Sequence, residues 1–164
     1  MLQMDNEKED IKLQFGINSL VVNRFYIEMK DELASMIISA QKREYTFEIK
    51  CENKGSIPHN LLFINVTVKV YLDKEKKLEL GCIELLNTFQ IPELKQYLLE
   101  EKNILDLPIP LEFALISISI SHTRAMLYSK CAGTFLQDAM LPIVNPMDFI
   151  KGKQLVPEIQ DSIF

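Results

Sequence analysis

Apolar and polar residues alternate in three separate stretches of the first half of the chain, which predicts three β-strands. The first stretch, Ile17–Met29, is apolar at most odd positions, and Leu20 and Val22 make its other face partly apolar as well. The second stretch, Tyr45–Cys51, opposes aromatic and aliphatic residues to charged ones, and the third, Leu62–Leu72, alternates most regularly. All three are therefore expected to lie in one sheet with a buried face.

A fourth strand is predicted from Leu78, after a turn at Asp73–Lys77 that closes a hairpin with the third strand. Its apolar phase slips by one residue between Leu80 and Ile83. A β-bulge at Gly81-Cys82 would absorb this slip, because a bulge inserts one extra residue into one strand of a pair.

The bulge decides which face each side chain of the fourth strand occupies. With it, Ile83 and Leu85 join the face of Phe47 and Ile49, and Glu84 points the other way. Without it the two faces exchange, since a slip of one residue inverts every side chain.

Two helices are predicted in the second half. Proline in the first turn marks a short helix from Ile91-Pro92 to Asn103. Earlier in the chain, Asn53–Pro58 is predicted to be the loop between the second and third strands. The segment Pro110–Cys131 is ambiguous, because part of it alternates like a strand. Serine and other polar residues nevertheless recur there with helical spacing, and Gly133 is well placed to end a helix, so a long helix is preferred.

Strands that precede helices are typical of an α+β domain. We therefore predict a four-stranded antiparallel sheet with a long C-terminal helix packed on one face. Residues 1–164 form a single domain in this prediction, with an ordered core of about 15–150 between a polar N-terminal and a loosely patterned C-terminal tail.

Composition narrows the function. The chain has 164 residues with 23 acidic and 18 basic side chains, and a net charge of −5 argues against nucleic acid as a partner. Cys51, Cys82 and Cys131 are far apart and odd in number, which is typical of buried thiols in a reducing compartment. Because the start of the chain is polar and Ile109–Ile120 is too short to span a bilayer, we expect a cytoplasmic protein with no membrane insertion.

Motifs of catalysis are missing from the sequence. It contains no glycine-rich nucleotide loop, no nucleophile elbow and no zinc-binding helix motif. His59 is expected at the surface, and His122 would be a general base only if a nucleophile or acid faced it. The plainer interpretation of His122 is a helix residue bonded to a backbone carbonyl or a serine. We therefore predict no catalytic residue, no metal, no cofactor and no enzymatic activity.

Apolar surface is in excess. The first strand, the aromatic second strand and the long helix offer more hydrophobic faces than one small sheet-and-helix layer hides. The protein either forms an obligate oligomer, or offers a hydrophobic groove to a partner, or both. The alternative is that all of these residues form the core of a monomer.

The order of these elements resembles the SecB family of bacterial export chaperones, tetramers that hold precursor proteins unfolded. The similarity spans roughly Val21 to Phe149. It rests on the segments Glu44–Ile49, Cys82–Glu84, Phe89–Ile91, Asn103–Leu105, Gly133–Phe135 and Leu141–Pro146. The last of these is similar to the family's proline-valine-asparagine segment after the long helix.

The resemblance implies a long groove between sheet, crossover loop and helix, in which clients lie extended. The matching groove residues are Tyr45, Phe47, Ile49, Ile57, Ile83, Leu85, Leu111, Leu115 and Ile118. In the family the motor SecA docks on the acidic outer face of the sheet, which Glu84, Glu28 and Glu48 match here. The alternative for these three residues is a plain solvated surface.

The function that we expect is therefore that of an ATP-independent holdase. It would bind unfolded or precursor proteins for export, with SecA as a partner, or a dedicated client such as an antitoxin. It would assemble as a homotetramer or, failing that, a homodimer. One alternative is a hot-dog-like enzyme acting on acyl-thioesters through His122, although the hot-dog helix normally comes earlier in the chain. Another is a structural subunit with one fixed partner.

Overall fold

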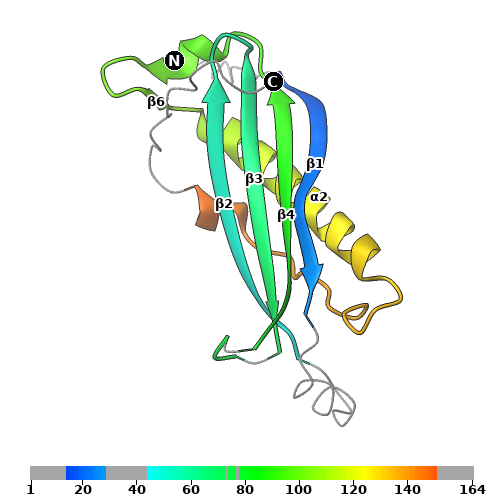
Figure 1. Cartoon of the computed structure of the whole chain (residues 1–164). Helices are drawn as coiled ribbons and strands as arrows, with labels where there is room; N and C mark the ends of the chain where they lie inside the picture. Colours follow the sequence, from blue (N-terminus) through cyan, green and yellow to red (C-terminus); the bar gives the residue numbers. More distant parts are fainter. Residues whose placement is uncertain (1–13, 29–43, 73, 77, 151–164) are drawn as a thin grey trace, which may run out of the picture.

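The computed structural model describes residues 14–28, 44–72, 74–76 and 78–150. It shows one four-stranded antiparallel sheet with a long helix lying obliquely across one face (Figure 1). The predicted fold class is therefore confirmed. The predicted tails, and the end of the first strand at Met29, lie outside the described residues.

The four strands follow the order β1-β4-β3-β2 across the sheet. Their bounds are β1 (Gly16–Ile27), β2 (Thr46–Ser56), β3 (Leu61–Tyr71) and β4 (Glu79–Gln90). The even positions of β3, from Leu62 to Val70, face the helix and are completely or almost completely buried. This is the alternation that a sheet with one covered face requires.

The extra residue of the predicted bulge is Leu80, one position earlier than expected. Val70 pairs with Gly81 whereas Tyr71 pairs with Glu79, so Leu80 has no partner on β3. The predicted faces are nevertheless correct. Ile83 lies opposite Val68, which in turn lies opposite Ile49 of β2, and the pairing of Glu84 with Thr67 puts its side chain on the outer face.

The ambiguous segment is helical, as preferred from the sequence. Helix α2 (Ile109–Cys131) buries one stripe against the sheet, made of Leu111, Leu115, Ile116, Ser119, Ile120, Thr123, Leu127 and Cys131. Serine and threonine at two central positions of this stripe are small, and each hydroxyl bonds a carbonyl of its own helix, which satisfies it inside the core. Gly133 follows the helix with φ +74°, as predicted for a residue that ends it.

Two local predictions are wrong. The predicted helix from Ile91 to Asn103 is only a 3-10 turn, η1 (Leu94–Tyr97), followed by a hairpin of β5 (Leu98–Leu99) and β6 (Ile104–Leu105). The backbone is left-handed at Glu93 and already extended at Leu98, with φ −84° and ψ 120°, so the helical turn is limited to the four residues between them.

The predicted loop at Asn53–Pro58 is also shorter than expected, because β2 continues to Ser56. Gly55 is buried under the β5–β6 hairpin, where a Cβ would overlap the side chain of Leu105. Glycine in this segment therefore allows close packing and does not mark a turn.

Candidate functional site

The residues predicted to line a groove fall into two groups. Ile83 and Leu85 of β4 are 0% exposed, and Leu111 and Leu115 of α2 are 2% and 0% exposed. These four side chains form the closed core between sheet and helix. In the single chain they are inaccessible to a client.

The other five predicted groove residues are half-buried at the margin of this core: Tyr45, Phe47, Ile49, Ile57 and Ile118. Three of them lie on β2 or directly before it, at the edge of the sheet. Here the helix face of the sheet is only partly covered by α2, because the helix runs obliquely across the strands (Figure 1). Their role in client binding stays a prediction.

A segment that the sequence analysis did not include in the groove lies in this gap. Residues 142–150, called here the C-terminal segment, follow α2 and the buried Leu141 and contain the 3-10 turn η2 (Pro146–Phe149). Figure 1 shows η2 between β2 and α2. Val144, Phe149 and Ile150 pack against the core cluster. The sequence could have indicated this segment, because it has apolar residues between two prolines. The prolines prevent a regular helix, and the apolar side chains are nevertheless stabilised by burial.

Arg124 of α2 is the main polar attachment of this region. Its Nε donates to the carbonyl of Leu141 at 3.0 Å, and Nη2 donates to the carbonyl of Pro142 at 2.9 Å. The side chain of Asn145 accepts a bond from the amide of Met147 and so caps η2 locally. The guanidinium group thus fixes the start of the C-terminal segment to the helix.

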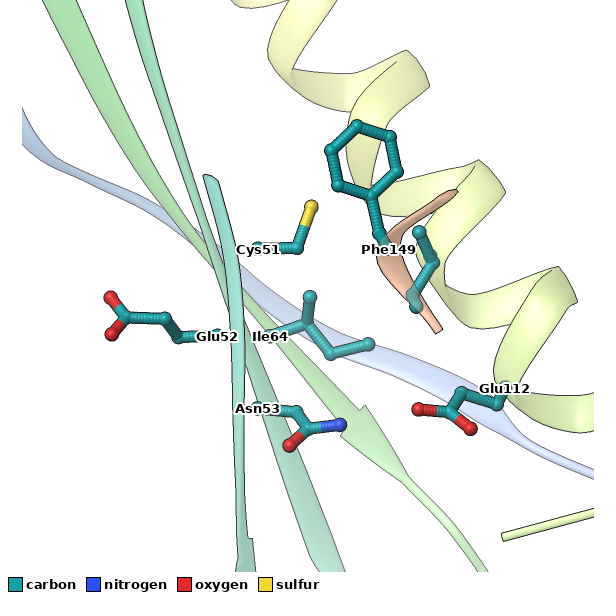
Figure 2. A pocket seen from close by; sticks show the side chains of 7 residues that line it. Cys51, Glu52, Asn53, Ile64, Glu112 and Phe149 are labelled. Carbon is teal, nitrogen blue, oxygen red and sulfur yellow. The ribbon is translucent and has the colours of Figure 1, made fainter. Parts of the chain in front are cut away.

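Phe149 closes a small space between β2 and α2 (Figure 2). Cys51, Asn53 and Ile64 line it from the sheet, and Glu112 and Ile116 from the helix. In Figure 2 the Cys51 thiol points toward the Phe149 ring, whereas Glu52 points away from the space. Its volume of about 10 Å³ is that of a single water, so the aromatic ring fits closely.

Burial changes the acidity of two groups in this space. It raises the pKa of the Cys51 thiol to about 12, which makes the thiol a poor nucleophile. It also raises the pKa of Glu112, to which the nearby charge of Asp106 adds. Cys51, Cys82 and Cys131 are all free thiols, and only the last two are fully buried.

A second, more open hollow lies between the outward face of α2 and the start of the C-terminal segment. It has a volume of about 240 Å³. Phe113, Ser117, Ile120, Ser121 and Arg124 line it from the helix, and Ile143, Val144 and Pro146 from the segment. The middle of the C-terminal segment therefore fits less closely than Phe149 does.

The outer face of the sheet carries charges of both signs. Glu48 pairs with Lys76 at 3.1 Å, and Glu84 pairs with Arg24 at 3.5 Å and accepts a bond from Asn65. Glu28 is exposed just after β1. Since each of the first two carboxylates has a cationic neighbour, this face is balanced and not strongly acidic. SecA docking there stays a prediction.

Glu79 ties three strands together on the same outer face. It accepts bonds from the Tyr26 hydroxyl on β1 and from Nζ of Lys69 on β3, the latter at 3.0 Å. The bond to Glu79 raises the pKa of Tyr26 and that of Lys69, so both groups stay protonated at neutral pH. Cys82 lies between these two residues and is 1% exposed, although its strand position faces outward.

The two histidines occupy different environments. His59 is exposed, as predicted. His122 is half-buried and its Nδ1 lies 2.9 Å from Oδ1 of Asn87 on β4, so its partner is neither the carbonyl nor the serine that we expected. Across the described ranges, no three or more histidine, cysteine or acidic side chains are grouped so that they could hold a metal ion.

Large apolar side chains remain exposed on several elements. They are Ile17, Leu20 and Val21 of β1, Leu99 of β5, Ile109, Phe113 and Tyr128 of α2, and Met140, Ile143 and Met147 after it. Ile143 is the extreme case, at 93% exposure. No helix in the described part of the chain is sufficiently long and apolar to cross a bilayer.

No protein-family model matches the sequence, and no curated protein matches it either. Among solved structures, the chain is similar to the SecB-like chaperone Rv1957 of Mycobacterium tuberculosis, solved in complex with a ChAD peptide from the Rv1956 HigA1 antitoxin. The identity is 11%, the TM-score is 0.48, and the similarity covers 79% of this chain and 83% of that one. This similarity is too low to assign a family, so function must be inferred from the residues themselves.

Proposed function

We propose that the protein is an ATP-independent holdase that binds apolar segments of unfolded or precursor proteins between α2 and β2. The observation that carries this proposal is the occupancy of that site by the chain itself. An irregular, proline-containing segment lies there, with Val144 and Phe149 packed inward and Ile143 exposed. A surface that accommodates one such segment has the chemistry to accommodate another.

Physical considerations support a broad specificity. Aromatic and aliphatic side chains of β2 and α2 form part of the site, and they attract apolar groups without demanding a particular arrangement of hydrogen bonds. An unfolded client loses conformational entropy when it binds, which limits the affinity per unit of buried area. Such a site suits reversible holding of many segments.

The wider context of binding belongs to the same proposal. The client would be either an exported precursor, with SecA as receiving motor, or one dedicated protein such as an antitoxin. The protein would act as a homotetramer, because β1 exposes Leu20 and Val21 on opposite faces and α2 exposes Phe113 and Tyr128. It would have no enzymatic activity, and it would work in the cytoplasm without binding nucleic acid.

An aggregation assay tests the proposal. The purified protein is added at stoichiometric amounts to a chemically unfolded test enzyme, and light scattering is followed after dilution, with an equal mass of an inert protein as control. We expect scattering to be suppressed equally with and without ATP. Unchanged aggregation, together with no client recovered from cells with the tagged protein, would contradict a holdase.

The acyl-thioester enzyme remains the competing hypothesis, with His122 as its base. The bond to Asn87 orients this imidazole, and its other nitrogen is left for a proton. Hydrolysis of an acyl-CoA series that is lost in H122A and kept in H59A would favour the enzyme over the holdase. A structural subunit would instead recover one fixed partner and leave unfolded proteins unbound.

A further inference from the structure

The C-terminal segment occupies the same space in which we place the client. We infer that residues 142–150 act as a built-in substitute for the client, a strap that fills the gap between α2 and β2 until an apolar segment of the client displaces it. This inference rests on the proposed function and adds to it a mechanism of regulation and a client sequence class.

The strap has the chemistry of an unfolded client. Five of its nine residues are Ile, Val, Met or Phe, and Pro142 and Pro146 keep it out of any regular helix or strand ladder. It therefore contacts the gap through side chains and not through a ladder of backbone bonds. An extended apolar segment of another protein would make contacts of the same kind.

The strap is held weakly. Leu141, directly before it, is 2% exposed, but none of the nine residues 142–150 is buried. Among the described residues, the bond from Arg124 to Pro142 is its one hydrogen bond to another element, since its other bonds are local to η2. Segments with few buried contacts open at low free-energy cost while the rest of a domain stays folded.

The fit of the strap is uneven along its length. The Phe149 ring closes a space of about 10 Å³, whereas the hollow beside Val144 has about 240 Å³. A bulkier apolar side chain at this position would remove more of the apolar wall of the hollow from water, so it would bind better. The preferred client therefore carries two bulky apolar residues five positions apart, in the places of Val144 and Phe149.

Displacement of the strap sets the observed affinity. When a site is open only a fraction of the time, its apparent dissociation constant equals the intrinsic constant divided by that fraction. Arg124→Gln removes the cation that holds the carbonyls of Leu141 and Pro142, and it does so at a distance from Phe149. Lys130→Gln is the matched control, because Lys130 lies at the last turn of α2 over the ring of Phe25.

Two readouts on the full-length chain separate the strap from the client site. The first is the alkylation rate of Cys51, followed by peptide mass spectrometry, because Cys51 lies under Phe149 and becomes accessible when the strap opens. The second is the affinity for a fluorescent peptide with the sequence of residues 143–150, which lacks the two carbonyls that Arg124 binds, and for the same peptide with Val144→Phe. Cys82 and Cys131 serve as buried internal controls for alkylation.

We expect Cys51 to be alkylated about tenfold faster in R124Q than in wild type, and R124Q to bind both peptides about tenfold more tightly. K130Q should have the alkylation rate and the peptide affinity of wild type. The Val144→Phe peptide should bind more tightly than the natural one. Faster alkylation with unchanged or weaker peptide binding would overturn the strap while the holdase stands. Faster alkylation without peptide binding by any form would refute the holdase instead.

A covalent lock provides the converse test. In F149C the new thiol lies on the same small space as Cys51, so oxidation should join the two and hold the strap in place. The oxidised form should then bind the peptide at least tenfold more weakly, and a reductant should restore binding. Met147→Cys, at an exposed position of the same segment, should not give this lock. If the locked form binds the peptide as the reduced form does, the strap is excluded.

Discussion

Nδ1 of His122 on α2 lies 2.9 Å from Oδ1 of Asn87 on β4 and joins the middle of the helix to the sheet. The Asn87 amide nitrogen donates to the carbonyls of Ile64 and Leu85, at 3.3 and 3.4 Å. Its oxygen is therefore the atom that faces the imidazole, and Nδ1 must carry the proton. A buried amide with all of its groups bonded helps to define one position of the helix on the sheet.

This environment predicts a stability that depends on pH through His122. Burial lowers its pKa below the ordinary value of 6.5, so the unfolded chain takes up the proton first as the pH falls. The free energy of unfolding should therefore decrease below about pH 6.5 and level off below the pKa of the folded state. Urea titrations between pH 7.5 and 5 should show this decrease in wild type and a smaller one in H122Q, whose amide can still donate to Asn87.

The exposed His59 supplies the control for that measurement. H59Q makes the same substitution at an exposed position and is the variant with which H122Q is compared. Equal slopes for wild type and H122Q would show that His122 does not titrate differently in the folded chain.

Two glycines of the sheet should differ in their tolerance of substitution by alanine. At Gly81, beside the bulge, a Cβ would lie 2.8 Å from the backbone oxygen of Tyr26 and 3.2 Å from Cδ1 of Leu136. Backbone on one side and a buried side chain on the other leave little room, so G81A should lose about 1–3 kcal/mol of unfolding free energy in urea.

Gly16 of β1 is the control, because a Cβ there meets nothing within 4 Å. G16A should change the unfolding free energy by less than about 0.5 kcal/mol. A comparable loss in both variants would contradict the close approach at the bulge as the cause of the effect.

The strands and the long helix were predictable because their patterns extend over many residues. The alternation of β3 has its exact counterpart in the buried residues Leu62 to Val70, and the polar spacing on α2 outweighed a short run of alternating isoleucines. The segment after Ile91 was not predictable. Its conformation depends on Leu94, which is 0% exposed, and on the bond from the Leu94 amide to Asn60, a residue far away in sequence.

The candidate site was predictable only in part for a related reason. Alternation identifies the face on which Ile83 and Leu85 lie, but it does not say how far along that face the helix extends. Because α2 crosses the sheet obliquely, it packs on β3 and β4 and leaves the margin at β2 to the C-terminal segment (Figure 1). Leu85→Glu would consequently unfold the chain, since it would bury a charge in the core, and is unsuitable as a probe of binding.

Two adjacent residues of β2 give a better probe of the client site. Phe47 faces the helix side and is half-buried, whereas Glu48 faces outward and pairs with Lys76. Both substitutions are made in the R124Q background, in which the strap competes less with the peptide. F47S should weaken peptide binding at least about tenfold, because it removes up to roughly 1.5–3 kcal/mol of apolar contact. E48Q loses only an exposed ion pair and should bind as its parent does.

Fluorescence anisotropy with the peptide of residues 143–150 measures both variants, and circular dichroism verifies that each is folded. An E48Q variant that loses binding while F47S retains it would move the client site to the outer face of the sheet. Equal binding by both variants would exclude the β2 margin as part of the site.

The last prediction concerns assembly, for which α2 offers exposed aromatic side chains. Phe113 near its start and Tyr128 near its end are 38% and 56% exposed. Ser117, Ser121 and Arg124 between them line the hollow beside the C-terminal segment, so the aromatic side chains are the part of this stripe that is available to a second copy of the chain. In a twofold interface each substitution counts twice. F113E should therefore weaken the free energy of association by about 3–6 kcal/mol, from roughly 1.5–3 kcal/mol for each Phe.

We expect light scattering to show a tetramer for wild type and a smaller species for F113E at micromolar concentration. S129E adds the same charge at an exposed position of the same helix and should leave the tetramer intact. A monomeric wild type would contradict assembly through these aromatic side chains.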